Sequence, residues 1–143
     1  MREILFSGKR KDNGEWVEGY YVCLNGKEHR IYTGYAEIDC GSYYPDFYEV
    51  IPETIGQYTG LTDKNGTKIF DGDIVAQDWY DYNEPSDDSF GEVLFCGYDC
   101  SFSVLDINKD GIVPLGRCHA YHWEVEVIGN IHDNPELLRS DTE

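Results

Sequence analysis

Basic residues are scarce in this sequence. It has 11 lysines and arginines against 28 aspartates and glutamates, which gives a formal net charge of −17 at pH 7. Phosphate groups are bound mainly by lysine and arginine, so this balance argues against direct binding to nucleic acid. It favours high solubility and partners that are cations or basic proteins.

Long apolar runs are missing as well. The start, MREILFSGKRKDNGEW, contains no apolar stretch of the length found in a secretory signal peptide. No later segment approaches the ~18 consecutive apolar residues of a membrane span. We therefore expect a cytoplasmic protein without membrane association. Its five cysteines should stay reduced, because that compartment is reducing.

Methionine occurs once and glycine 15 times, a composition that argues against a helix bundle. Asparagine or aspartate precedes glycine at five places, which are Asn13-Gly14, Asn25-Gly26, Asn65-Gly66, Asp71-Gly72 and Asp110-Gly111. Such pairs suit a type I′ hairpin turn, whose two central residues need positive φ. Runs rich in valine, isoleucine and aromatic residues lie between these pairs. The pattern predicts a mainly β protein with antiparallel sheets.

The clearest predicted strand covers residues 121–127. Successive side chains of a strand face opposite sides, so Tyr121, Trp123, Val125 and Val127 share one face, which we expect to be buried. Further strands are expected over residues 2–6, 15–24, 30–35, 46–51, 55–60, 68–70, 73–77, 92–98, 101–107 and 112–115.

Loops and one helix complete the expected elements. Residues 35–44 and 81–89 are expected to be loops. Asn134 can cap a helix, Pro135 fits its first turn and Glu136 suits its positive end. These residues predict a short C-terminal helix over residues 135–139.

The stretch QYTGLTDKNGTKIFDGDIV, residues 57–75, combines two short strands with turn chemistry. Asp63 can accept hydrogen bonds from nearby backbone N–H groups, and Asn65-Gly66 can reverse the chain. Asp71-Gly72 then redirects it into the next strand. A structural role explains every residue of the stretch, so we interpret it as scaffold.

The same stretch, the ending EVEVIGNIHDNPELL (residues 124–138) and the start MREILFSGKRKDNGEWVEGYY resemble the YopX family of phage and prophage proteins. The resemblance implies a phage or prophage protein in a bacterial host cell. At 143 residues the chain is expected to form a single domain over residues 1–143. Within it, an N-terminal β-hairpin region is expected over about residues 1–56. An antiparallel, barrel-like (SH3-like) sheet is expected over about residues 57–143. The family implies no activity, so no catalytic residue is carried over.

A calcium site is one alternative for DINKDG. Asp106, Asn108 and Asp110 occupy the first, third and fifth positions of an EF-hand loop, and Gly111 the sixth. The twelfth position, which should be a bidentate glutamate, is Arg117. A hairpin turn is the favoured interpretation, and calcium binding stays open.

A zinc site is a second alternative, built from Cys96, Cys100, Cys118, His119 and His122. On a strand with ~3.3 Å per residue, Cys118 and His122 would lie about 13 Å apart, too far for one ion. We therefore interpret the cysteines as small apolar residues. No metal or cofactor is expected.

The sequence shows no recognisable catalytic arrangement. No cysteine or serine stands in a nucleophile elbow, and no glycine-rich segment precedes a helix to hold phosphate. We expect a protein that is not an enzyme.

Between residues 69 and 108 we count ten aspartates and glutamates and no lysine or arginine. A solvated face explains such a run. The sharper hypothesis is a partner-binding segment, in which aromatic rings supply contact area and carboxylates steer a basic protein. Its candidate residues are Asp78, Trp79, Tyr80, Asp81, Glu84, Asp87 and Asp88.

These observations favour an acidic, non-enzymatic protein-interaction module. Self-association through sheet edges or aromatic patches is a further expectation. The alternative is a DNA mimic, whose carboxylates imitate phosphates and block a host protein that binds nucleic acid. A metal- or thiol-dependent enzyme is the third hypothesis.

Overall fold

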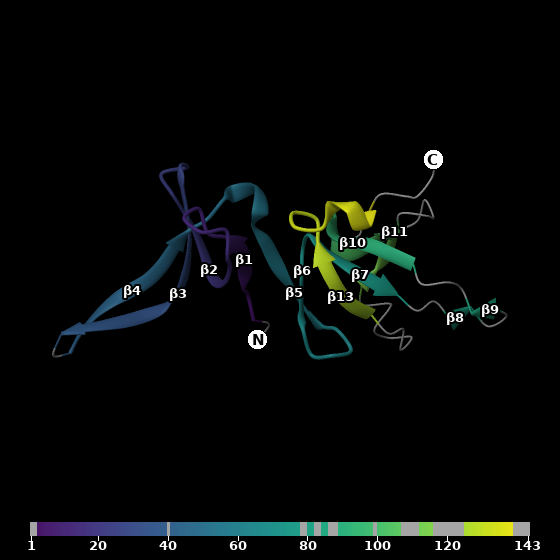
Figure 1. Ribbon diagram of the computed structural model, residues 1–143, viewed down its shortest axis with the longest axis horizontal. Helices are drawn as coiled ribbons and strands as arrows, with labels where there is room; N and C mark the ends of the chain where they lie inside the picture. The colour runs from purple at the N-terminus through teal and green to yellow at the C-terminus, as the bar shows by residue number, and fades with distance from the viewer. Residues whose placement is uncertain are drawn as a thin grey trace. The chain divides into compact units, whose positions relative to one another are not determined.

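The computed structural model describes residues 3–39, 41–77, 80–81, 84–85, 89–98, 100–106, 112–115 and 125–138. Strands dominate this part of the chain, and all their pairings are antiparallel (Figure 1). The prediction of a mainly β, antiparallel protein is confirmed. The chain forms two compact units, Met1–Tyr58 and Thr59–Glu143. The two regions expected from the sequence divide at about residue 56.

The first unit is a meander of strands that ends with the start of β5. Its strands are β1 (Phe6–Lys9), β2 (Trp16–Leu24), β3 (Glu28–Asp39) and β4 (Ser42–Glu49), in the order β4-β3-β2-β1-β5. β3 and β4 form a long hairpin that runs out from the shorter strands (Figure 1). A 3-10 turn, η1 (Pro52–Thr54), leads from β4 to β5 (Gly56–Thr62).

Asn25 and Gly26 form the β2–β3 turn predicted from the sequence. Their φ angles are 54° and 68°, and the N–H of Lys27 donates to the carbonyl of Leu24 at 3.0 Å. Positive φ at both central positions is what a type I′ turn requires. The turn prediction is confirmed here.

A small core lies beneath this sheet. Ile31 and Val50 are fully buried and Leu5 is nearly so. Gly19 lets β2 and β3 approach each other, because a Cβ at this position would collide with the carbonyl oxygen of Tyr32. Ile31 is therefore enclosed between the strands, while its neighbours Arg30 and Tyr32 are half-buried on the other side of the sheet.

The second unit contains a five-stranded sheet in the order β12-β11-β10-β7-β13. Its strands are β7 (Asp73–Gln77), β10 (Ser89–Cys96), β11 (Ser101–Asp106), β12 (Ile112–Pro114) and β13 (Val125–Asn130). β6 (Lys68–Phe70) neighbours β5. One cluster of buried side chains forms the core, namely Ile69, Val75, Val93, Val104, Leu115 and Val125. Val125 belongs to this core and the partly buried Val127 packs against it, as the alternation predicted for these two residues. Tyr121 and Trp123, on the same predicted face, lie outside the described residues.

Two expected features of the second unit differ from the structure. The sheet ends at β12 and β13, which are not neighbours among the described strands, so it is not a closed barrel. The SH3-like description stays a prediction. Near the C-terminus, η2 (Pro135–Leu138) is a single 3-10 turn rather than the expected helix over residues 135–139.

Two secondary-structure predictions in the first unit, one of a loop and one of a strand, are wrong. Residues 35–44, expected as a loop, belong mostly to β3 and β4. Gly34 marks a β-bulge between Tyr32 and Gly34, and Gly41 lies at the hairpin turn with φ 90°. Both glycines therefore shape strands rather than a loop. The first strand was expected over residues 2–6. The observed strand β1 begins only at Phe6, so the two share a single residue.

Candidate functional site

The predicted acidic segment lies largely outside the described residues. Tyr80–Asp81 forms β8 and Glu84–Pro85 forms β9, and the two pair as Tyr80↔Pro85 and Asp81↔Glu84. The expected loop over residues 81–89 therefore contains a small antiparallel ladder. Asp78, Trp79, Asp87 and Asp88 fall in the part that is not described. Partner binding by this segment stays a prediction.

The two metal hypotheses also fall mainly on such residues. Asp106 ends β11, and residues 107–111 lie beyond the described part. Cys118, His119 and His122 lie outside it too. Cys96 and Cys100 are free thiols. Within the described ranges, no three His, Cys, Asp or Glu side chains stand close enough to hold a metal ion.

The structure instead brings aromatic side chains together on the first unit. We call this set the ring face, and it consists of Tyr20, Tyr32, Tyr35, Tyr43 and Phe47. Its central row crosses three strands, because Tyr20 pairs with Tyr32 and Tyr32 pairs with Phe47. Directly opposite residues of an antiparallel pair point to the same side of the sheet. The rings of Tyr32 and Phe47 lie 5.3 Å apart between centroids.

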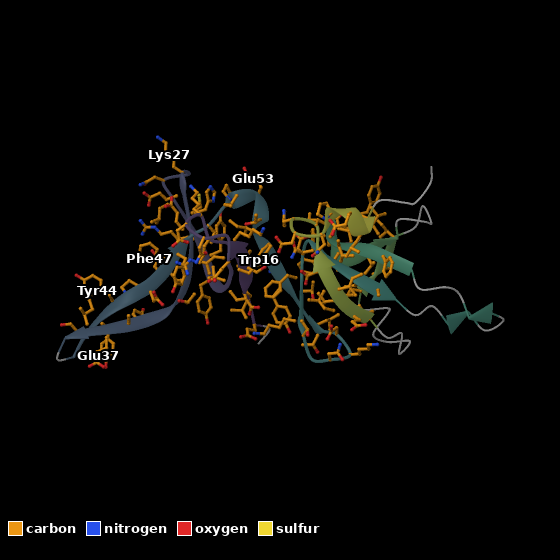
Figure 2. All side chains as sticks on the ribbon, in the orientation of Figure 1. Trp16, Lys27, Glu37, Tyr44, Phe47 and Glu53 are labelled. Atoms are coloured by element: carbon orange, nitrogen blue, oxygen red, sulfur yellow. The ribbon has the colours of Figure 1, made fainter. Side chains whose placement is uncertain are left out.

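The row continues along the β3–β4 hairpin. Tyr35 pairs with Pro45, and Glu37 pairs with Tyr43. β4 alternates regularly, so Tyr43 shares the side of Phe47. Tyr44 points to the opposite side, and Figure 2 shows Tyr44 and Glu37 projecting from opposite sides of this hairpin. Five rings thus follow one side of β2, β3 and β4.

The ring face is the solvent side of the sheet. Tyr21, Ile31 and Tyr48 form the neighbouring row, which faces the other way and contains the fully buried Ile31. By contrast, Tyr20 is 64% exposed and Tyr35 is 78% exposed. Large side chains that lie so open contribute little to the fold, and they are available for a partner.

Arg30 shows how the ring face binds a cation. Its guanidinium lies over the ring of Phe47, 4.2 Å from the centroid. It also donates to the hydroxyl of Tyr32 at 3.3 Å and to a carboxylate oxygen of Glu28 at 2.6 Å. Two directed hydrogen bonds thereby hold the guanidinium over this ring.

Carboxylates surround the rings. The charged residues on the same side of β2, β3 and β4 are Glu18, Glu28, Arg30, Glu37 and Glu49, as strand alternation places them. Glu28 forms an ion pair with Arg30, and a carboxylate oxygen of Glu49 lies 3.4 Å from the ammonium of Lys11. Against these four carboxylates stand three cations, namely Arg30, the Lys11 ammonium beside Glu49 and Lys9 opposite Trp16 on β1. This side of the sheet is therefore slightly acidic as well as aromatic.

The ring face was not predicted from the sequence. Seven of the 12 tyrosines lie between residues 20 and 48, which was the available signal. The face depends on the register of three strands, and a shift of one residue would move every ring to the other side.

A second group of interest lies in the second unit, around Gly72. Its N–H donates to the carbonyl of Val93 at 2.8 Å, and its carbonyl accepts from Ile131 at 2.9 Å. These bonds bring the neighbouring residues Asp71, Glu92 and His132 together.

The carboxyl groups of Asp71 and Glu92 both have raised pKa values. Burial raises the pKa of Asp71, and the positive charge of His132 partly offsets that rise. Burial also raises the pKa of Glu92, and the charge of Asp71 raises it further. The pair therefore keeps a proton at a higher pH than ordinary carboxyls do. Sequence analysis assigned Asp71 to a turn and overlooked this coupling.

Asp63, in the stretch over residues 57–75, accepts three backbone hydrogen bonds. One oxygen accepts from the backbone N–H groups of Asn65 and Thr67 at 2.9 Å, and the other accepts from Val127 at 3.0 Å. Burial alone would raise the pKa of Asp63, but these bonds lower it overall. The predicted local bonding is confirmed, and the bond to β13 adds a long-range link.

Comparisons with known proteins agree with the fold. The family model described as "YopX protein" matches residues 5–139. The chain is also similar to a solved structure, protein EF1440 from Enterococcus faecalis, with 25% identity and a TM-score of 0.64. That match covers 97% of this chain and 100% of the other. No curated protein matches the sequence. Within the described part of the chain, no helix has the length and apolarity to cross a bilayer.

Proposed function

The chain belongs to the YopX family, and from this premise we propose that it is a non-enzymatic module that binds a protein partner. The ring face is the surface that supports this proposal best. Tyrosine supplies large contact area at low conformational cost and is enriched at the energetic centres of protein interfaces. An open row of such rings on paired strands is a preorganised binding surface.

The size of the available burial supports the same proposal. Covering one large apolar side chain contributes roughly 1.5–3 kcal/mol. Tyr20, Tyr35 and Tyr43 are each exposed by more than 60%, so covering them would supply several such increments. This gain is enough to offset part of the entropy that association costs.

The acidic composition gives the proposed partner its charge. A net charge of −17 attracts basic proteins over distances of about a Debye length, ~8–10 Å at ordinary salt. We place the partner in the cytoplasm of a bacterial host, in keeping with the proposed phage or prophage origin. Self-association stays the less favoured expectation, because two copies repel each other by charge.

DNA mimicry is the second candidate. The ten acidic residues without a basic one between residues 69 and 108 favour it. In this case the carboxylates of the second unit would occupy the phosphate sites of a host protein. Binding would not depend on the ring face.

A pull-down from lysate of the bacterial host separates the two candidates. The immobilised chain is compared with a variant that combines Tyr20→Ala and Tyr43→Ala. The proposal expects a specific protein to be captured by the wild type and lost by the variant. Equal capture by both of a DNA-binding protein, released at high salt, would support mimicry instead. An empty pull-down would count against both.

A further inference from the structure

We propose that the ring face binds an extended segment of the partner that carries arginine side chains. This inference rests on the proposed protein-binding function and specifies the chemistry of the partner. Its basis is the combination of open tyrosine rings, surrounding carboxylates and a guanidinium that already occupies one ring of the set.

The dimensions of the ring face suit an extended segment. Tyr43 and Phe47 are four residues apart on β4, which corresponds to about 13 Å along the strand. Three neighbouring strands at ~4.8 Å spacing place Tyr20 about 10 Å across the sheet from Phe47. A partner segment of four to five extended residues would cover this length, with alternate side chains directed at the rings.

The chemistry of the rings selects a guanidinium. The face of an aromatic ring is electrostatically negative and attracts cations, and planar guanidinium can also stack on it. The chain places a guanidinium close over a ring twice, whereas the ammonium of Lys9 lies farther from the centroid of Trp16, at 5.7 Å. Arg30 lies 4.2 Å from the centroid of Phe47, and Arg10 lies 4.1 Å from that of Tyr48. Tyr20, Tyr35 and Tyr43 offer the same type of surface while being largely exposed.

The charge of this side of the sheet favours a basic segment over nucleic acid, an anionic membrane or a second copy of the chain. Glu18, Glu28, Glu37 and Glu49 share the side of the rings, and Arg30 is already paired with Glu28. Nucleic acid and anionic membrane would meet this acidic side with their own negative charge. A second copy would bring another −17. An arginine-bearing segment can both stack on the rings and pair with the carboxylates.

Fluorescence anisotropy with a labelled nine-residue peptide tests the inference. The probe has four arginines that alternate with glycine and serine, and a matched peptide has lysine in place of each arginine. Both have the same charge, so general attraction to an acidic protein is equal for the two. We expect the arginine peptide to bind the full-length protein several-fold more tightly, because lysine does not stack in the same way. Equal affinities would overturn the inference.

Variants then locate the binding. Tyr35→Ala combined with Tyr43→Ala should weaken the arginine peptide by roughly 5- to 30-fold, as expected for two lost cation–ring contacts. Tyr44→Ala, on the opposite side of β4, and Tyr98→Ala, fully exposed in the second unit, should leave affinity unchanged. Equal loss in the control variants would overturn the assignment to the ring face. A labelled thymidine oligonucleotide that bound in a manner dependent on Tyr35 and Tyr43 would also overturn it.

The two experiments distinguish failure of the arginine inference from failure of the proposed protein-binding function. If the pull-down depends on Tyr20 and Tyr43 while neither peptide binds, protein binding by the ring face stands and the arginine inference fails. If the arginine peptide binds at the ring face while the pull-down is empty, the preference of this surface for arginine stands and the proposed protein partner in the host fails.

Discussion

Tyr43 and Tyr44 are neighbours on β4 with almost equal exposure, 64% and 63%, yet they face opposite sides of the hairpin. Tyr43 shares its side with Tyr32 and Phe47, while Tyr44 lies opposite Ala36 on the other side. The chain thus contains a pair of tyrosines that differ mainly in the face they present.

Neither Tyr43→Ala nor Tyr44→Ala should alter folding. Exposed side chains away from caps, cores and networks usually change the free energy of unfolding by less than ~0.5 kcal/mol. Thermal unfolding followed by far-UV circular dichroism checks this. A loss of partner capture by Tyr43→Ala with an unchanged melting temperature would then reflect the surface. A melting temperature lowered by many degrees in Tyr43→Ala would show that the ring has a structural role.

Gly19→Ala should destabilise the first unit. The added Cβ would collide with the carbonyl oxygen of Tyr32 and approach Ile31 to 3.1 Å, so β2 and β3 would have to separate. Insertion of a methyl group into such a contact costs about 1–3 kcal/mol. Urea denaturation measures the change.

Gly97→Ala is the matched control for this substitution. A Cβ at Gly97 meets no atom within 4 Å, and its backbone does not have a positive φ that would strain alanine. We expect a change near zero. Equal effects at both positions would contradict the close approach of β2 and β3.

The features that were predicted correctly are those set by interactions between residues close together in the sequence. The turn at Asn25-Gly26 needs two residues of positive φ, and the strands over residues 68–70 and 73–77 have the predicted bounds, β6 (Lys68–Phe70) and β7 (Asp73–Gln77). Each of these features depends on a few consecutive residues. The same is true of the hydrogen bonds from Asn65 and Thr67 to Asp63.

The features that were missed depend on residues far apart in the chain. The ring face requires that β2, β3 and β4 adopt one register, and a bulge near Gly34 adjusts that register midway. Glycines within β3 and at its turn made residues 35–44 resemble a loop. The coupling of Asp71 to Glu92 likewise depends on the pairing of β10 with the chain around Gly72. Composition and the periodicity of single strands do not specify which distant strands pair or where a bulge shifts their register.

Asp63→Ala should lower the free energy of unfolding by about 1–3 kcal/mol, because it leaves backbone donors without their acceptor. The pKa of Asp63 is lowered in the folded state. Its stabilising contribution is therefore present above the unfolded pKa, about 3.9, and is lost as the pH falls through the lower folded value. Urea denaturation between pH 2 and pH 7 should show a smaller acid-induced loss in the variant than in the wild type.

Asp12→Ala provides a contrast to Asp63→Ala. Asp12 pairs with Arg10 at the surface, with a side chain that is 63% exposed. Surface ion pairs contribute at most about 1 kcal/mol. If the two substitutions had equal cost, the three backbone hydrogen bonds of Asp63 would not have the stabilising role assigned to them.

Asp71→Asn should stabilise the second unit at neutral pH. The folded pKa values of Asp71 and Glu92 are raised, by burial first and, for Glu92, also by the charge of Asp71. A group of this kind contributes stability that is present below the unfolded pKa and is lost as the pH rises through the folded pKa. Asparagine removes one of the two charges. The gain at pH 7 should be about 0.5–2 kcal/mol, the range of favourable charge changes.

Carboxyl titration by NMR gives an independent measurement of the coupling. In Asp71→Asn the pKa of Glu92 should move down toward its usual range, because one cause of its rise is gone. Glu15→Gln removes the same charge at an exposed site of the first unit and should leave the Glu92 titration unchanged. An Asp71→Asn variant that is less stable at pH 7, with Glu92 titrating as in the wild type, would show that the attraction between Asp71 and His132 outweighs the repulsion between the carboxylates.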